Sequence, residues 1–366
     1  MSESPGGYNP EETQAHDRLP RERLRSVSLR KLILEWGVAV VVVLAINAVA
    51  IAAIHQFDPN RFRVQVGVKY DLLRDAGGDY DSLILGDSTP NQGVIPSVLG
   101  EEAGGTWANL ATVADMLALN SVWLLTEYIE RYGPPERVLL CHVPDMWHRE
   151  VDLKILSQAK IPINGFGELD PPLGLGAKDK LELFTTRYAP LYSNNESLSR
   201  LVMKPWKAEN LHHMFDADGF MPMAEQEEGW QEAIEAAKLE HLQQPFAVSD
   251  INARSVQRLI DMAQEHGFTL YLTPGSVSPG LAGSAGYQRN FDDMIEQYRA
   301  WAASSERVVL ILDTPQSFPT PMMYDEDHVT LEGAQRWSKR IAEAIRRHEA
   351  ASDSPAIGTD PGEDTR

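Results

Sequence analysis

The chain has 366 residues, of which 43% are hydrophobic, which is enough for one large domain or two small ones. Its formal net charge of −20 argues against a nucleic-acid-binding protein, because neutralising phosphates requires basic patches. The single cysteine, Cys141, excludes an intrachain disulfide and lies in an apolar run, where a buried thiol is expected.

The N-terminal region joins a basic stretch to a long apolar segment. Residues 18–31 hold six Arg or Lys residues, and the nineteen residues 36–54 carry no charge. That length is near the ~20 residues that cross a bilayer core. Basic flanks stay in the cytoplasm. We therefore expect a basic, disordered cytoplasmic segment at 1–35, a transmembrane helix at 36–54 in the inner (plasma) membrane, and an extracytoplasmic remainder.

Two other interpretations compete with a retained anchor. Ala48-Val49-Ala50 fits a small-residue cleavage site, so the segment can also be read as a signal peptide, although its 35-residue basic region is long for one. The third reading is a soluble cytosolic protein in which the apolar segment is a core helix.

Downstream, short apolar strands alternate with amphipathic helices. Strands are predicted at 81–85, 106–110, 137–143, 268–273 and 307–313. Helices are predicted at about 114–132, 250–266, 286–303 and 331–347. This alternation predicts an α/β domain at 70–348, with a mainly parallel sheet of about five strands covered by helices on both faces.

Residues 150–245 interrupt that alternation. They contain a glycine-rich stretch at 164–176, a proline-rich turn and an acidic stretch near 224–242 that predicts a helix. We expect an insertion over the strand ends, either a lid or a lobe that shapes a substrate site. The last residues, 349–366, are rich in Asp, Pro, Gly and Ser and are predicted to form a disordered tail.

Two short motifs follow the first and the last strand. Gly86-Asp87-Ser88 follows strand 81–85, and Asp325-Glu326-Asp327-His328 precedes the last helix. Sites in parallel sheets form at the carboxyl ends of strands, so the two motifs should meet. A serine hydroxyl needs a base, which histidine provides, and a carboxylate fixes the histidine tautomer. Ser88, His328 and Asp325 are therefore the candidate nucleophile, base and orienting acid.

An oxyanion formed at this serine would need hydrogen-bond donors. The candidates are the backbone N–H of Ser88 and the loop that contains Asn109 and Ala111.

Each motif also has a plainer interpretation. Gly-Asp-Ser is common in turns, and acidic residues suit the first turn of a helix. The joint position of the motifs favours catalysis. Asp216-Ala217-Asp218-Gly219 lacks the spacing of a calcium loop and predicts a turn. No metal ligand set and no nucleotide-binding motif is recognised, so we expect neither a metal nor another cofactor.

These residues resemble the SGNH/GDSL hydrolase superfamily over roughly 80–148 and 249–347. Gly86-Asp87-Ser88 matches its nucleophile block, and Asp325-x-x-His328 matches its final block. Asn109-Leu110-Ala111 is similar to the second block, with Ala111 in the place of a glycine whose amide serves the oxyanion hole.

The third block departs from the family pattern. It normally reads Gly-x-Asn-Asp, and here the sequence is His142-Val143-Pro144-Asp145. Proline therefore stands where the asparagine oxyanion donor would be.

The resemblance implies a flavodoxin-like three-layer αβα sandwich. With the anchor, the altered third block and the insertion, the chain is similar to SGNH-like proteins of bacterial envelope polysaccharide modification, including alginate acetylation proteins and the lipoteichoic-acid D-alanylation protein. We therefore expect an extracytoplasmic serine acyl-esterase or O-acyltransferase that acts on an acylated carbohydrate, with a membrane acyltransferase as a partner. The alternative is a non-catalytic polysaccharide-binding or scaffold protein, which Pro144 favours.

Overall fold

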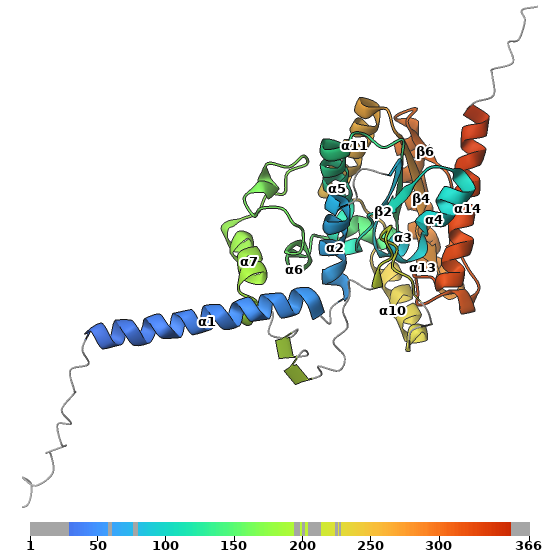
Figure 1. The fold of residues 1–366 in the computed structure, drawn as a ribbon. Coiled ribbons are helices and arrows are strands. Elements are labelled where there is room, and N and C mark those ends of the chain that lie inside the picture. The colour runs from blue at the N-terminus through green and yellow to red at the C-terminus, as the bar shows by residue number, and fades with distance from the viewer. Residues whose placement is uncertain are drawn as a thin grey trace, which may run out of the picture. The chain divides into compact units, whose positions relative to one another are not determined.

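The computed structural model describes residues 29–57, 61–75, 80–193, 198–199, 202–203, 214–223, 226 and 228–352 (Figure 1). The chain divides into two compact units, Met1–Ala48 and Val49–Arg366. Most of the expected cytoplasmic segment, residues 1–28, lies outside the described residues, as does 353–366 of the expected tail.

The first helix, α1, spans Leu29–Phe57. Its stretch Leu29–Ala53 is long and apolar enough to cross a membrane. Large apolar side chains such as Val41, Leu44 and Val49 are exposed along it, as a bilayer-embedded helix requires. The helix begins before residue 36, because the charged residues before the apolar run continue the same helical turns.

A five-stranded parallel sheet forms the centre of the second unit. Its order is β2-β1-β3-β4-β6, with β1 at Ser82–Gly86, β2 at Trp107–Asn109, β3 at Arg137–His142, β4 at Thr269–Pro274 and β6 at Val308–Leu310. The prediction of an α/β domain with about five parallel strands is confirmed. A second, two-stranded parallel sheet pairs β5 (Ser276–Val277) with β7 (Gln316–Ser317).

Helices cover both faces of the large sheet. Successive strand residues point to opposite faces, so Leu83 and Leu85 join one apolar cluster and Ile84 joins the other. The first cluster includes residues of α5 (Leu117–Tyr132), α11 (Asp250–His266) and α13 (Ala285–Ala303). The second includes residues of α4 (Pro96–Ala103) and α14 (Leu331–Ser352), and Figure 1 shows α5 and α14 on opposite sides of the strands.

The predicted helices 114–132, 250–266, 286–303 and 331–347 are all present. The first starts as a 3₁₀ turn at Ala114–Met116 and continues as α5. The last, α14, runs on to Ser352, so residues 349–352 of the expected tail are helical. The acidic helix expected near 224–242 is α10, Trp230–Gln243.

The remaining described helices lie between these elements. They are α2 (Arg61–Asp75), α3 (Ser88–Gly93), α6 (Leu153–Leu156), α7 (Ala177–Tyr188), α8 (Pro190–Ser193) and α12 (Pro279–Ala282). Further 3₁₀ turns occupy Pro144–His148, Gly165–Gly167 and Thr320–Met322. Helix α3 packs closely on α14. At Gly93 there is no room for a side chain, since a Cβ would lie 2.5 Å from the Trp337 ring.

Candidate active site

Ser88 is the first residue of α3, directly after the sharp exit from β1. Gly86 has φ +142°, and a Cβ there would lie 2.0 Å from the carbonyl oxygen of Cys141, so the turn requires glycine. Asp87 is the N-cap of α3. Ser88 itself is half-buried, and neither its N–H nor its Oγ makes a hydrogen bond to a described residue. Both groups therefore remain available to a ligand.

Asp87 is fully buried and ties the start of α3 to the end of β3. Its Oδ1 accepts hydrogen bonds from the N–H of Thr89 (2.9 Å) and the Thr89 hydroxyl (2.7 Å). Its Oδ2 accepts from the Val143 N–H (2.9 Å) and lies 3.2 Å from Nδ1 of His142. Burial acts to raise the pKa of Asp87, but the His142 and Thr89 interactions outweigh it and lower the pKa. Asp87 is thus an ionised cap that fixes the position of Ser88.

His328 is buried and is held by two carboxylates. Its Nδ1 lies 2.8 Å from both oxygens of Asp325 and 2.8 Å from Oδ1 of Asp327. Its Nε2 is buried and has no hydrogen-bond partner within the described part of the chain. When Nδ1 carries the proton, Nε2 of the neutral ring has a free lone pair, which is the arrangement a general base needs.

The pKa of the His328 imidazole depends on its two acidic neighbours, Asp325 and Asp327. Burial acts to lower the pKa of His328, but Asp325 and Asp327 raise it well above its usual value. Burial likewise acts to raise the pKa of Asp325, yet the nearby His328 brings it down to about 2. Burial, together with the Asp325 charge, raises the pKa of Asp327 to about 6, although His328 opposes this. Asp325 is therefore the firmly ionised partner of the imidazole.

Residues 275–278 connect the His328 loop to α3. The Ser276 hydroxyl donates to the carbonyl of Asp327, and the Ser278 N–H donates to the carbonyl of Glu326 at 2.7 Å. On the other side, a Cβ at Gly275 would lie 2.7 Å from Oγ1 of Thr89. The structure thus brings the Ser88 and His328 segments to the same edge of the sheet. A hydrogen bond between Ser88 Oγ and His328 Nε2 is not formed.

Asn109 and the backbone N–H of Ala111 make hydrogen bonds within the fold. The Asn109 side-chain amide donates to the carbonyls of Pro90 (2.8 Å) and Val94 (3.0 Å), and its Oδ1 accepts from the Ala111 N–H (3.1 Å). Carbonyls at the end of a short helix need such partners. In this conformation neither Asn109 nor the Ala111 N–H is free to serve an oxyanion, and the Asn109 amide instead holds α3 against β2.

Helix α2 supplies two buried polar residues that sequence analysis missed. Lys69 is fully buried, and its Nζ donates to the carbonyls of Asn109 (2.8 Å) and Gly219. Burial lowers the pKa of Lys69 well below its usual value, although Asp216 opposes this. Gln65 accepts a hydrogen bond from Asn91 of α3 at 2.8 Å. No motif marks either residue in the sequence, because their role depends on long-range contacts.

Part of the 150–245 insertion also reaches this edge. Asp216–Gly219 is a turn, as predicted, in which Oδ1 of Asp216 accepts from the N–H groups of Asp218 and Phe220. Backbone groups of residues 218–223 make hydrogen bonds to three neighbouring elements. The Asn109 N–H of β2 donates to the Asp218 carbonyl, and the Met221 N–H donates to the Asn91 carbonyl of α3. The Leu331 N–H of α14 donates to the Met223 carbonyl. This part of the insertion is therefore fixed to β2, α3 and α14.

Asp325, Asp327 and His328 are close enough together to hold a metal ion, which the sequence did not predict. The ring nitrogen that faces the carboxylates lies at the distance of an N–H···O hydrogen bond from both. The same contacts therefore fit a proton shared between the imidazole and its acids.

Neither a protein-family model nor a curated protein matches the chain.

Proposed function

We propose that the protein is an extracytoplasmic serine acyl-esterase or O-acyltransferase that acts on ester groups of a cell-envelope carbohydrate. The observation that carries the proposal is the state of His328. Its Nδ1 is fixed by carboxylates, its Nε2 is buried and unpartnered, and its loop lies at the same sheet edge as Ser88. A buried imidazole with one free nitrogen, at the same sheet edge as a serine, supports an assignment to nucleophilic catalysis.

The mechanism assigns one step to each side chain. Ser88 Oγ attacks the ester carbonyl while His328 Nε2 takes its proton, and Asp325 stabilises the imidazolium. The Ser88 N–H donates to the oxyanion. The ester C–O bond then breaks, His328 protonates the departing alcohol, and an acyl-serine remains. Water or a sugar hydroxyl attacks that intermediate with His328 again as the base, which releases the free acid or the new ester and restores the serine.

The reaction requires Ser88 Oγ to approach His328 Nε2. Catalytic hydrogen bonds are often long in unliganded enzymes and tighten when substrate binds. Rotation of Ser88 about its Cα–Cβ bond changes the direction of Oγ without moving α3, whose start is held by Asp87.

We further infer a flavodoxin-like three-layer sandwich of the SGNH type. The strand order β2-β1-β3-β4-β6 supports it, because it matches the doubly wound order in which the second strand lies outside the first. In the same proposal, the 150–245 insertion acts as a lid or shaping lobe, supported by the bonds of Asp218, Met221 and Met223 to the site elements. A membrane acyltransferase partner would supply the acyl group.

The test is ester hydrolysis by the full-length protein in detergent. With 4-nitrophenyl acetate as substrate, we expect Ser88→Ala to lose activity by about 10³-fold or more, because no other group replaces the nucleophile. The matched control is Ser97→Ala, an exposed serine on α4, which should keep wild-type activity. Unchanged turnover in Ser88→Ala, or normal labelling of that variant by a serine-directed fluorophosphonate, would reject the mechanism.

A second candidate function is non-catalytic polysaccharide binding. It is favoured by the engagement of the Asn109 amide and the Ala111 N–H within the fold, and by Pro144, which has no N–H to donate. This candidate predicts glycan binding that Ser88→Ala and His328→Ala leave unchanged, with no turnover of any ester.

A further inference from the structure

Helices α7 and α8 expose a cluster of large apolar side chains. Leu181, Phe184 and Tyr192 are 63%, 51% and 80% exposed, and we call these three residues the α7–α8 apolar face. Leu183 and Thr186, on the inward side of α7, are buried. Helix α7 therefore carries apolar side chains on its outward side as well as on its inward side. Large exposed apolar side chains on two successive helices suggest an interaction surface.

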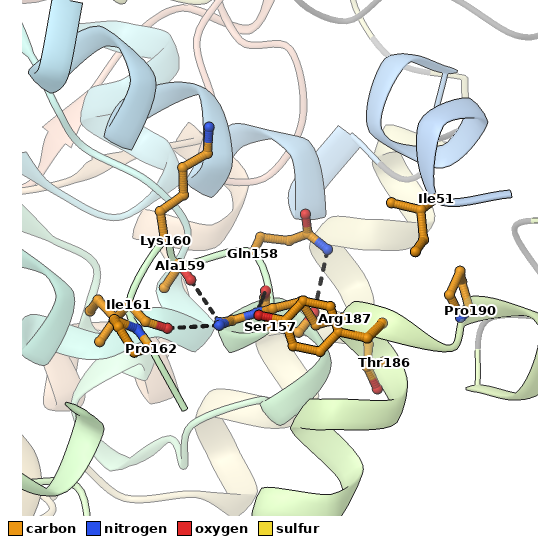
Figure 2. A pocket seen from close by; sticks show the side chains of 11 residues that line it. Ile51, Ser157, Gln158, Ala159, Lys160, Ile161, Pro162, Thr186, Arg187 and Pro190 are labelled. Atoms are coloured by element: carbon orange, nitrogen blue, oxygen red, sulfur yellow. Dashed lines mark hydrogen bonds between the residues drawn. The ribbon is translucent and has the colours of Figure 1, made fainter. Parts of the chain in front are cut away.

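The α7–α8 apolar face is held rigidly by the element beneath it. Arg187, near the end of α7, donates to the carbonyls of Ser157 (2.9 Å), Ile161 (2.7 Å) and Ala159 (2.7 Å), as Figure 2 shows. The same loop is tied to α2, because Lys160 pairs with Asp71 and its carbonyl accepts from Arg74 at 3.1 Å. These contacts fix α7 to the loop 157–161 and, through that loop, to α2.

The ends of α7 and α8 share a pocket with the last turns of the apolar helix. Only residues 58–60 separate α1 from α2, and the apolar span of α1 ends at Ala53. Within the unit Val49–Arg366, Ile51 lines the same pocket of about 480 Å³ as Arg187 and Pro190 (Figure 2). The charge of the segment also fits an anionic lipid surface: residues 177–193 hold three basic and two acidic residues in a chain of net charge −20.

We propose that the α7–α8 apolar face docks into the surface of the lipid bilayer that holds α1. Helices that lie in the membrane interface insert their apolar side chains about 5–10 Å into the boundary between headgroups and acyl chains. With α1 as one attachment and this face as a second, the domain would have a fixed orientation and a fixed height above the membrane. The proposal depends on α1 entering a bilayer and is independent of ester hydrolysis.

The experiment measures lipid contact at single positions in the full-length protein. Phe184→Cys is labelled with an environment-sensitive fluorophore and reconstituted into vesicles of phosphatidylcholine and phosphatidylglycerol. The native Cys141 is fully buried and is not expected to react. Lipids brominated near the top of their acyl chains should quench the label strongly, and aqueous iodide should quench it several-fold less than in detergent. The matched control is Leu239→Cys on α10, where a 58% exposed leucine should show the opposite pattern.

Each other outcome overturns the proposal in an identifiable way. Quenching of the Phe184→Cys label by iodide but not by brominated lipid means that the face stays in water. Protection from iodide already in detergent, without quenching by brominated lipid in vesicles, means that another part of this chain covers the face. Protection in native membranes but not in pure lipid vesicles points to a protein partner instead. A label at Ala45→Cys within α1 separates failure of docking from failure of the anchor. If α1 spans the bilayer, brominated lipid should quench this label whether or not the α7–α8 apolar face docks.

Discussion

At the scale of single residues, the second carboxylate on His328 has a consequence for pH dependence. Two anions beside Nδ1 raise the pKa of His328, so at neutral pH much of the base is protonated and cannot accept the serine proton. Activity should therefore rise with pH. In Asp327→Asn the imidazolium loses one of its anions, so we expect the pKa of His328 to fall and the acid limb of kcat/KM to move to lower pH. The measurement is the pH profile of aryl acetate hydrolysis.

Asp325→Asn provides the comparison for that profile. The Asp325 carboxylate also accepts hydrogen bonds from the backbone N–H groups of His328 (2.8 Å) and Asp327 (3.1 Å). Its replacement therefore removes contacts that hold both the imidazole ring and the backbone of this loop. We expect a fall of about 10²–10⁴-fold in kcat at every pH, which Asp327→Asn should not show. If the two variants behave alike, Asp325 has no special orienting role and the two carboxylates are interchangeable.

The residues of the candidate site differ in how far the sequence could predict them. Asp325 and His328 lie three positions apart in one loop, so their contact is local and the motif predicts it. The role of Asn109 was not predictable in the same way. Its amide turns to the carbonyls of Pro90 and Val94 because the short helix α3 ends beside β2, which is a long-range packing effect. The catalytic interpretation of the motif gives Asp327 no role, although its side chain reaches the same ring nitrogen.

At the scale of elements, α2 links the region after α1 to the site through Lys69. A lysine whose pKa is lower in the folded chain than in the unfolded chain takes up a proton on unfolding. The unfolding free energy therefore rises with pH between the lowered folded-state pKa and the usual value of 10.5. The slope contributed by this one group approaches about 1.4 kcal/mol per pH unit. In Lys69→Met we expect that contribution to vanish, as measured by urea unfolding at pH 8, 9 and 10.

The control for this prediction is Lys339→Met, which removes an exposed lysine from α14 and should leave the pH slope unchanged. Equal slopes for wild type and Lys69→Met over the same range would mean that burial does not lower the pKa of Lys69. Activity gives a second readout, because Lys69 holds the Asn109 carbonyl and, through it, the loop beside α3.

The strands and most helices were predictable because their patterns are local. Strands β1, β3 and β4 are short apolar runs whose residues are almost all buried, so hydrophobicity alone marks them. Helix ends were harder to predict. Helix α14 runs to Ser352 because the residues after its last buried side chain, Ile345, include the good helix formers Arg, Glu and Ala. The attachment of residues 214–223 to β2 and α3 had no sequence signal, since it is made by backbone groups.

At the scale of the whole molecule, the side of the membrane decides whether the proposed substrate can be reached. Arg and Lys residues near a membrane span are retained in the cytoplasm, and six lie within residues 18–31 on the N-terminal side of the apolar run. We therefore expect Ser97→Cys, an exposed position in the α/β domain, to react with a membrane-impermeant maleimide in intact spheroplasts. Ser2→Cys should react only after lysis. The retained chain should keep its full mass of 40.8 kDa, whereas signal-peptide cleavage would shorten it.

Replacing the six basic residues of segment 18–31 by glutamine tests the cause of that orientation. If the charges set the topology, a fraction of the chains should invert, and the Ser97→Cys label should then appear partly after lysis. Full labelling of Ser2→Cys in intact spheroplasts, or labelling of Ser97→Cys only after lysis in the parent chain, would place the α/β domain in the cytoplasm. An envelope carbohydrate could not then be its substrate, even if Ser88 and His328 hydrolysed an aryl ester in detergent.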